Sequence, residues 1–210
     1  MYPVGYEADY VELRNRLRVG FRLILAIPWL ILAQYIYPIA VFVVAVIAWF
    51  ALLFTGRYPR WAYDFNAGFL RMWGRVNAFL LLQTDEWPPF GFEQAPQYPI
   101  RVPVGPAQER YSRLRVFFRL IIGIPALFVA GLLGYVAQTV SVLSWFTIVF
   151  TGRQPAGLHN VLSVGQAYAV RATAYFLLMT ERLPPVSDQG VAPSPSPPLA
   201  APPAPAASDA

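Results

Sequence analysis

The side chains of this sequence that could do chemistry are nearly all arginines. The chain has 16 basic residues, and every one of them is an arginine. A guanidinium group donates paired hydrogen bonds to phosphate and carboxylate oxygens, so arginines point to anion binding. The candidates for contact with a lipid headgroup or another anion are Arg57, Arg60, Arg71, Arg75, Arg153 and Arg171.

Enzymatic chemistry has little support in the sequence. A catalytic site needs a nucleophile with a base, a carboxylate pair or a metal cluster. The chain has one histidine, His159, and no cysteine. We expect His159 to be solvated or to cap a helix, and the adjacent carboxylates of Asp85 and Glu86 to diverge in a turn. We therefore predict that the protein is not an enzyme and holds no cofactor and no metal, with a membrane enzyme acting on lipid as a minor alternative.

The composition is that of an integral membrane protein. The chain is 57% hydrophobic and 13% charged, whereas a soluble domain averages about 45–50% apolar and about 25% charged residues. The net charge of +5 could suit nucleic acid, but the arginines flank apolar runs. We therefore expect anionic membrane lipids as partners and no nucleic acid.

Two nearly identical stretches reveal an internal duplication. W-F-A-L-L-F-T-G-R occupies residues 49–57, and W-F-T-I-V-F-T-G-R follows 96 residues later at 145–153. Other pairs keep this offset, among them Thr84-Asp85 and Thr180-Glu181. We predict a first membrane repeat over residues 2–92 and a second over 98–186. Residues 187–210 are rich in proline, alanine and serine, and we predict a disordered tail there.

Each repeat is predicted to contain a helical hairpin. Residues 23–54 carry no charge and as one helix would be roughly 48 Å long, against a hydrocarbon core of roughly 30 Å. A fold-back also places the arginines before and after it on one side of the membrane. The expected breaks are Tyr35–Pro38 in the first copy and Gly134 in the second. A shallow re-entrant hairpin is the alternative. The predicted arms are 11–34 with 38–54, and 113–133 with 135–150.

A third helix is expected after each hairpin. Over residues 61–83, Asp64, Gly68, Arg71 and Arg75 fall on one helical face, and aromatic residues cover the rest. Such a helix suits the membrane interface, and the alternative is a spanning helix whose polar stripe packs inside a bundle.

Aromatic and extended segments complete each predicted unit. Trp49 and Trp145 are candidate interfacial anchors. Residues 2–10 and 98–104 read as short extended segments, either edge strands or ordered linkers. The fold class predicted is thus an all-α integral membrane protein of two tandem repeats. Each repeat is a helical hairpin plus an amphipathic interfacial helix, with a short extended segment before each hairpin.

Several motifs of the first copy resemble the bacterial membrane family called domain of unknown function 4389. The resemblance covers about residues 2–186. The second copy departs from the pattern where Gln154-Pro155-Ala156 replaces Tyr-Pro-Arg. The family has no established activity, so the resemblance implies no catalytic residues. The motifs that carry it are A-I-P (26–28), A-W-F (48–50), F-T-G-R-Y-P-R (54–60), D-F-N (64–66) and T-D…P-P-F (84–90).

The function expected from these features is non-enzymatic. We predict a multi-pass protein of the bacterial inner membrane with both termini in the cytoplasm and no cleaved signal peptide. It would act as a scaffold or accessory subunit that contacts lipid headgroups, a partner membrane protein or another copy of itself. The alternative is a small oligomeric permease or channel. Neither apolar run contains the ionisable residue that such a pathway commonly uses.

Overall fold

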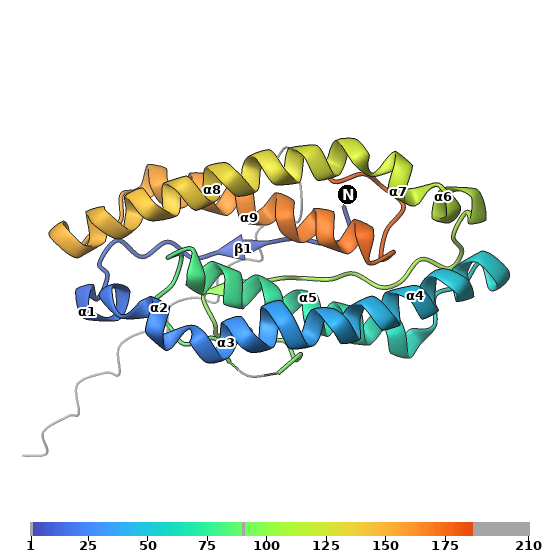
Figure 1. Ribbon diagram of the computed structural model, residues 1–210, viewed down its shortest axis with the longest axis horizontal. Helices are drawn as coiled ribbons and strands as arrows, with labels where there is room; N and C mark the ends of the chain where they lie inside the picture. The colour runs from blue at the N-terminus through green and yellow to red at the C-terminus, as the bar shows by residue number, and fades with distance from the viewer. Residues whose placement is uncertain (1, 90, 187–210) are drawn as a thin grey trace, which may run out of the picture.

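The chain folds as two copies of one helical unit, each with a long apolar helix followed by a return helix (Figure 1). The structure is a computed structural model that describes residues 2–89 and 91–186. The first copy contains β1 (Glu7–Ala8), α1 (Arg16–Gly20), α2 (Arg22–Leu25), α3 (Ile27–Ile31), the π-helix η1 (Leu32–Ile36), α4 (Tyr37–Thr55) and α5 (Arg60–Leu80). The second contains β2 (Ile100–Arg101), α6 (Arg113–Phe117), α7 (Arg119–Ile122), α8 (Ile124–Thr151) and α9 (Ala156–Phe176).

The predicted hairpins are wrong, because each apolar run continues as one helical path. Gly134 lies inside α8, which runs unbroken over Ile124–Thr151. A glycine within a helix costs only about 1 kcal/mol, which the surrounding apolar helix formers offset. In the first copy Pro38 lies in the first turn of α4, directly after η1. The π-turn there shifts the hydrogen-bond pattern, and a first-turn proline needs no amide partner, so the chain bends without reversing.

The two copies run in opposite directions. In Figure 1, α4 and α8 lie along the two long edges of the molecule, and α5 and α9 lie between them. The chain passes from left to right through α3 and α4, and from right to left through α8. We call α4 and α8 the outer helices, and α5 and α9 the inner helices.

The inner helices form the core, which corrects the prediction that the third helix of each copy lies at the membrane interface. Most of α5 is buried, including Asn66, Leu70 and Met72. By contrast, α4 buries Val41, Ala48 and Leu52 and leaves most of its other side chains at least partly exposed. Within the polar stripe of α5, the segment after the helix covers Gly68 and Arg75, whereas Asp64 stays exposed and Arg71 is half-buried. The inner helices therefore pack inside a bundle, as the alternative prediction had it, although Asp64 of the stripe stays exposed.

The extended segments pair with each other across the copies, and we call this pair the ribbon. β1 and β2 are antiparallel, with Glu7 opposite Arg101 and Ala8 opposite Ile100. An isolated bridge between Val4 and Val104 continues the pairing. The strand interpretation is confirmed over these residues. A repeat that pairs with its own copy in antiparallel register has a two-fold relation, so the ribbon marks the pseudo-two-fold axis of the molecule.

The ribbon and the outer helices lie on opposite faces of the inner helices. On α9, Ala169, Ala172 and Thr173 line a groove bounded by α4 and α8. Another face of α9 lies toward the ribbon. Val170 of α9 lies beside Gly74 of α5, and Gly74 in turn faces Val102, which follows β2. The backbone oxygen of Arg171 accepts a hydrogen bond from the Tyr2 hydroxyl. The molecule is thus a slab whose helices lie in its plane.

The two faces of the slab differ in polarity. On the ribbon, Arg101 pairs with Glu7 at 3.1 Å and Asp9 at 2.7 Å, and all three side chains reach solvent. On the outer helices, most of the exposed side chains are apolar and many are large, among them Phe42 and Phe128, which are 69% and 75% exposed.

Candidate functional site

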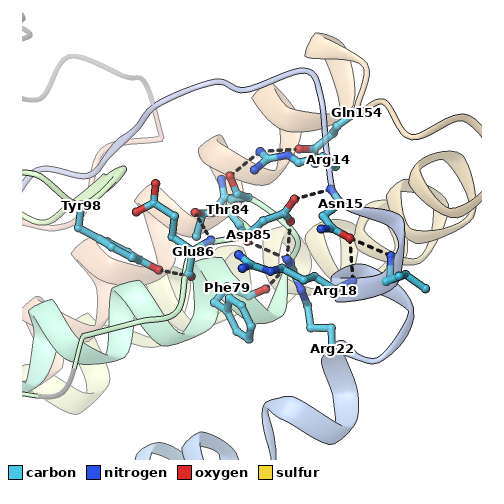
Figure 2. Close-up of polar contacts among 12 residues, drawn as sticks. Arg14, Asn15, Arg18, Arg22, Phe79, Thr84, Asp85, Glu86, Tyr98 and Gln154 are labelled. Atoms are coloured by element: carbon cyan, nitrogen blue, oxygen red, sulfur yellow. Dashed lines mark hydrogen bonds and ion pairs between the residues drawn. The ribbon is translucent and has the colours of Figure 1, made fainter.

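A buried polar cluster lies at the end of the slab where α1 begins (Figure 2). Arg22 is its centre and is only 3% exposed. Its guanidinium donates to the backbone oxygens of Phe79 and Thr84 and to the carboxylate of Asp85 at 2.7 Å. Burial lowers the pKa of Arg22 to about 10, and the Asp85 carboxylate offsets part of that shift.

Asp85 connects the return segment after α5 to the start of α1. Its second oxygen accepts a hydrogen bond from the backbone amide of Asn15 at 2.9 Å. The Asn15 side chain in turn caps α1 by accepting from the amides of Leu17 and Arg18. The Thr-Asp motif found in the sequence therefore closes the first unit. Glu86 beside it contributes its backbone, whose oxygen accepts from the Tyr98 hydroxyl and whose amide donates to the Thr84 hydroxyl.

The second copy repeats this arrangement with Glu181 in place of Asp85. Arg119 donates to the backbone oxygen of Thr180 and lies over the ring of Tyr175 at 4.1 Å. The Glu181 carboxylate accepts from the amide of Ser112 at the start of α6. The paired Thr-Asp and Thr-Glu motifs thus each place a carboxylate that orders the start of a helix.

Each Thr-Gly-Arg motif packs against the segment that precedes the first helix of the other copy. Gly56 and Gly152 end the outer helices with φ of 69° and 75°, a left-handed conformation that glycine adopts readily. The amide of Tyr111 donates to the oxygen of Gly56, and the amide of Arg14 donates to the oxygen of Gly152. The two copies are therefore interlocked at both ends of the slab.

At one of these ends, three arginines surround a hollow of about 450 Å³, which we call the arginine pocket. Arg57 comes from the first copy, and Arg110 and Arg113 come from the second. All three are exposed, and none of their guanidinium groups forms an ion pair or hydrogen bond with another described residue. The pocket is lined by Thr55, Gly56, Arg57, Arg110, Tyr111 and Arg113.

The structure separates the predicted anion-contact residues into two groups. Arg57 and Arg60 are exposed, Arg71 is half-buried, and Arg153 is exposed and pairs with Glu12 at 3.6 Å. Arg75 and Arg171 are only 4% and 2% exposed, so they cannot contact headgroups as predicted.

The two buried arginines bind the segments that follow the inner helices. Arg75 donates to the backbone oxygens of Gly91 and Glu93 at 2.9 and 3.1 Å. Arg171 donates to the oxygen of Pro185 at 3.4 Å. Sequence spacing placed Arg71 and Arg75 together on one helical face but could not tell which of them a later segment would cover.

The predicted tryptophan anchors are half-buried between the copies. Trp49 donates from its indole nitrogen to the oxygen of Val116 in α6 at 3.2 Å. Trp145 packs against Val19 of α1 and Ile148. Both tryptophans thus hold the short first helix of the other copy against an outer helix.

An apolar groove of about 680 Å³ runs between the outer helices on the face opposite the ribbon. Its wall on α4 extends from Pro38 to Trp49. That stretch is about 16 Å long at 1.5 Å per residue, close to half of a roughly 30 Å hydrocarbon core. Arg119 and Leu120 are also part of its lining.

His159 is buried at the start of α9, contrary to the expectation of a solvated residue. It is 2% exposed and its ring meets Tyr10 edge-on at 5.3 Å. Burial, and next the charge of Arg14, lower the pKa of His159 below its usual value. In residues 2–89 and 91–186, no group of three His, Cys, Asp or Glu residues could hold a metal ion.

The pKa of His159 predicts a loss of stability in mild acid. The unfolded chain binds a proton near pH 6.5, whereas folded His159 resists it, so lowering the pH through about 6.5 favours unfolding. We expect the thermal midpoint in detergent to fall between pH 7 and pH 5. His159→Gln should flatten that slope, because the chain has no second histidine. If the thermal midpoint of the variant fell as steeply between pH 7 and pH 5, His159 would not be the group responsible.

Comparisons with known proteins identify the repeated unit but no activity. The family described as Domain of unknown function (DUF4389) matches residues 16–91 and again residues 113–187. No curated protein and no solved structure matches the chain. Each matched segment contains one helix that is long and apolar enough to cross a membrane, namely α4 and α8.

Proposed function

Because this chain belongs to the family described as Domain of unknown function (DUF4389), in two tandem copies, we propose that it is a non-enzymatic membrane scaffold that contacts lipid. The observation that carries this proposal is that polar side chains are buried in the inner helices while large apolar side chains are exposed on the outer helices. Asn66 and Gln166 of the inner helices are buried, whereas Phe42 and Phe128 of the outer helices are exposed. Burying one large apolar side chain is worth roughly 1.5–3 kcal/mol, so a surface with many of them favours lipid strongly.

The slab lies in one leaflet with its helices parallel to the membrane. The support comes from the ribbon, whose strand β1 runs alongside the inner helices in the middle part of the molecule (Figure 1), with Glu7, Asp9 and Arg101 partly exposed. In a perpendicular arrangement these charges and strand edges would sit at the bilayer centre, where lipid-exposed strands do not occur. An in-plane arrangement keeps the ribbon in water and the outer helices in hydrocarbon.

In this proposal the protein lies on the cytoplasmic leaflet of a bacterial inner membrane. Arginines occur at both ends of the slab, before α1 and α6 and after α4 and α8. An in-plane slab holds both ends at headgroup depth on one side, which the positive-inside bias favours. Tyr2 and Pro185, which both hydrogen bond with Arg171, then face the cytoplasm.

Two extraction and labelling experiments test the proposal. We expect the chain to stay with the membrane after alkaline carbonate washing and to leave it only in detergent. Since the chain has no cysteine, Arg18→Cys and Arg57→Cys place single probes at opposite ends of the slab. An in-plane slab exposes both probes to an impermeant thiol reagent on the cytoplasmic side. Labelling from opposite sides would contradict this placement, and solubility without detergent would contradict the membrane scaffold.

A permease is the second candidate, and the antiparallel relation of the copies favours it. Inverted repeats related by a two-fold axis are typical of secondary transporters. In that case α4 and α8 would cross the bilayer, and another copy would have to cover the ribbon. Opposite-side labelling of the two probes together with solute flux in proteoliposomes would support it.

A further inference from the structure

We propose that the arginine pocket binds the phosphate of an anionic phospholipid. This inference deepens the proposed function, since it names the lipid chemistry and the place where it is recognised. Arg57, Arg110 and Arg113 bring three positive charges to one hollow, and no described acidic residue pairs with any of them. Guanidinium groups form their strongest hydrogen bonds with phosphate and carboxylate oxygens.

The opposite end of the slab carries the equivalents of the pocket arginines, and there they have partners within the chain. Arg153, the equivalent of Arg57, pairs with Glu12 at 3.6 Å. Arg16, the equivalent of Arg113, donates to the backbone oxygen of Thr151 at 3.1 Å. Leu13, which pairs with Arg153 in the backbone, takes the place of Arg110. Glu109 is the equivalent of Glu12, yet it forms no ion pair with Arg57 in the described chain. The same scaffold thus gives the arginines at one end hydrogen-bonding or ionic partners, and leaves those at the other end without a described side-chain partner.

The acidic residue that the structure does place near this end is already engaged. Glu181 accepts from the amide of Ser112 and pairs with Arg115 at 3.6 Å. It therefore compensates a neighbouring arginine outside the pocket lining.

The position of the pocket favours a lipid phosphate over a free ion. Thr55 and Gly56 end α4, whose exposed side chains are apolar up to Phe54. In the in-plane placement both ends of the slab lie at headgroup depth, so the pocket at the end of α4 adjoins the headgroup layer. A phosphate bound between Arg57 and Arg113 would then belong to a lipid whose chains cover the apolar face beside it.

Matched double variants test the pocket. Arg57→Gln with Arg113→Gln removes two charges from the pocket, and Arg153→Gln with Arg16→Gln removes two from the equivalent end. Purified, delipidated full chain in neutral detergent is titrated with short-chain phosphatidylglycerol, with phosphatidylcholine and with inorganic phosphate, and binding is read by native mass spectrometry. Thermal midpoints confirm that both variants are folded.

The expected result is a phosphatidylglycerol affinity that falls about tenfold or more in the pocket variant and changes within about twofold in the control. Equal losses of affinity in the two double variants would show an effect of net charge alone and would overturn the proposal. An unchanged affinity in the pocket variant would overturn it as well. Tight binding of inorganic phosphate that displaces the lipid would overturn the lipid assignment. Because micelles replace the bilayer, these outcomes are independent of whether carbonate washing releases the chain.

Discussion

Asp85→Ala is expected to lower the free energy of unfolding by about 3 kcal/mol or more, because it leaves a buried arginine without its counter-charge. Arg22 is 3% exposed and Asp85 is 17% exposed, so water cannot replace the lost carboxylate well. The variant also removes the acceptor for the Asn15 amide that orders the start of α1. Guanidinium-induced unfolding in detergent micelles, followed by tryptophan fluorescence, measures the change.

Glu86→Ala is the matched control for this prediction. Glu86 is the neighbouring acid in the same turn, is exposed, and contributes its backbone oxygen to the Tyr98 hydroxyl. Its loss should change stability by less than about 0.5 kcal/mol. If both alanine variants unfolded at the same denaturant concentration, Arg22 would be adequately satisfied by the oxygens of Phe79 and Thr84 alone.

The duplication and its motifs could be predicted from the sequence because they are local. Thr-Gly-Arg ends both outer helices through a left-handed glycine, at Gly56 and Gly152. The equivalence extends to backbone details, since Leu82 and Leu178 both adopt φ of 65° after the inner helices. Helix ends and repeats depend on residues that are close in the chain, so they can be predicted from the sequence alone.

The direction of the copies could not be predicted in this way. Hydropathy measures how apolar a segment is, but it does not distinguish a helix that would cross a membrane from one that would lie in the membrane plane. Residues 23–54 are too long to cross the membrane upright, and a hairpin was one solution to that excess length. A helix lying in the membrane plane is another, and nothing in the composition of α8 distinguishes the two. The antiparallel ribbon, with Val4 beside Val104, decides how the copies pair.

The candidate site was predicted only in part, for the same reason. Arg57 was identified from its motif, whereas its partners Arg110 and Arg113 come from the other copy. Their meeting depends on the interlock between Gly56 and Tyr111, a contact of 2.9 Å between residues distant in the chain. Burial of Arg75 and Arg171 likewise depends on segments that return over the inner helices.

Gly165→Leu is expected to separate α8 from α9 and to lower the free energy of unfolding by about 2 kcal/mol or more. A Cβ atom at Gly165 would lie 2.9 Å from the Cβ of Ala137 and 3.3 Å from the backbone oxygen of Leu133. Neither neighbour is a flexible side chain, so the helices must move apart. That movement would open the interface between α8 and α9, which is the most extensive helix packing in the second copy. It would also displace the residues of α9 that line the apolar groove.

Gly131→Leu separates this packing effect from the general effect of replacing a helical glycine. Gly131 lies on α8, and a Cβ there would have no described atom within 4 Å. Leucine has a better helix propensity than glycine, so this variant should unfold at the same or higher denaturant concentration, by up to about 1 kcal/mol. Comparing both variants with wild type in the same micelles isolates the contact. If Gly165→Leu were as stable as Gly131→Leu, the close approach of α8 and α9 at Ala137 would be wrong, and with it the position of the inner helices against the outer helices.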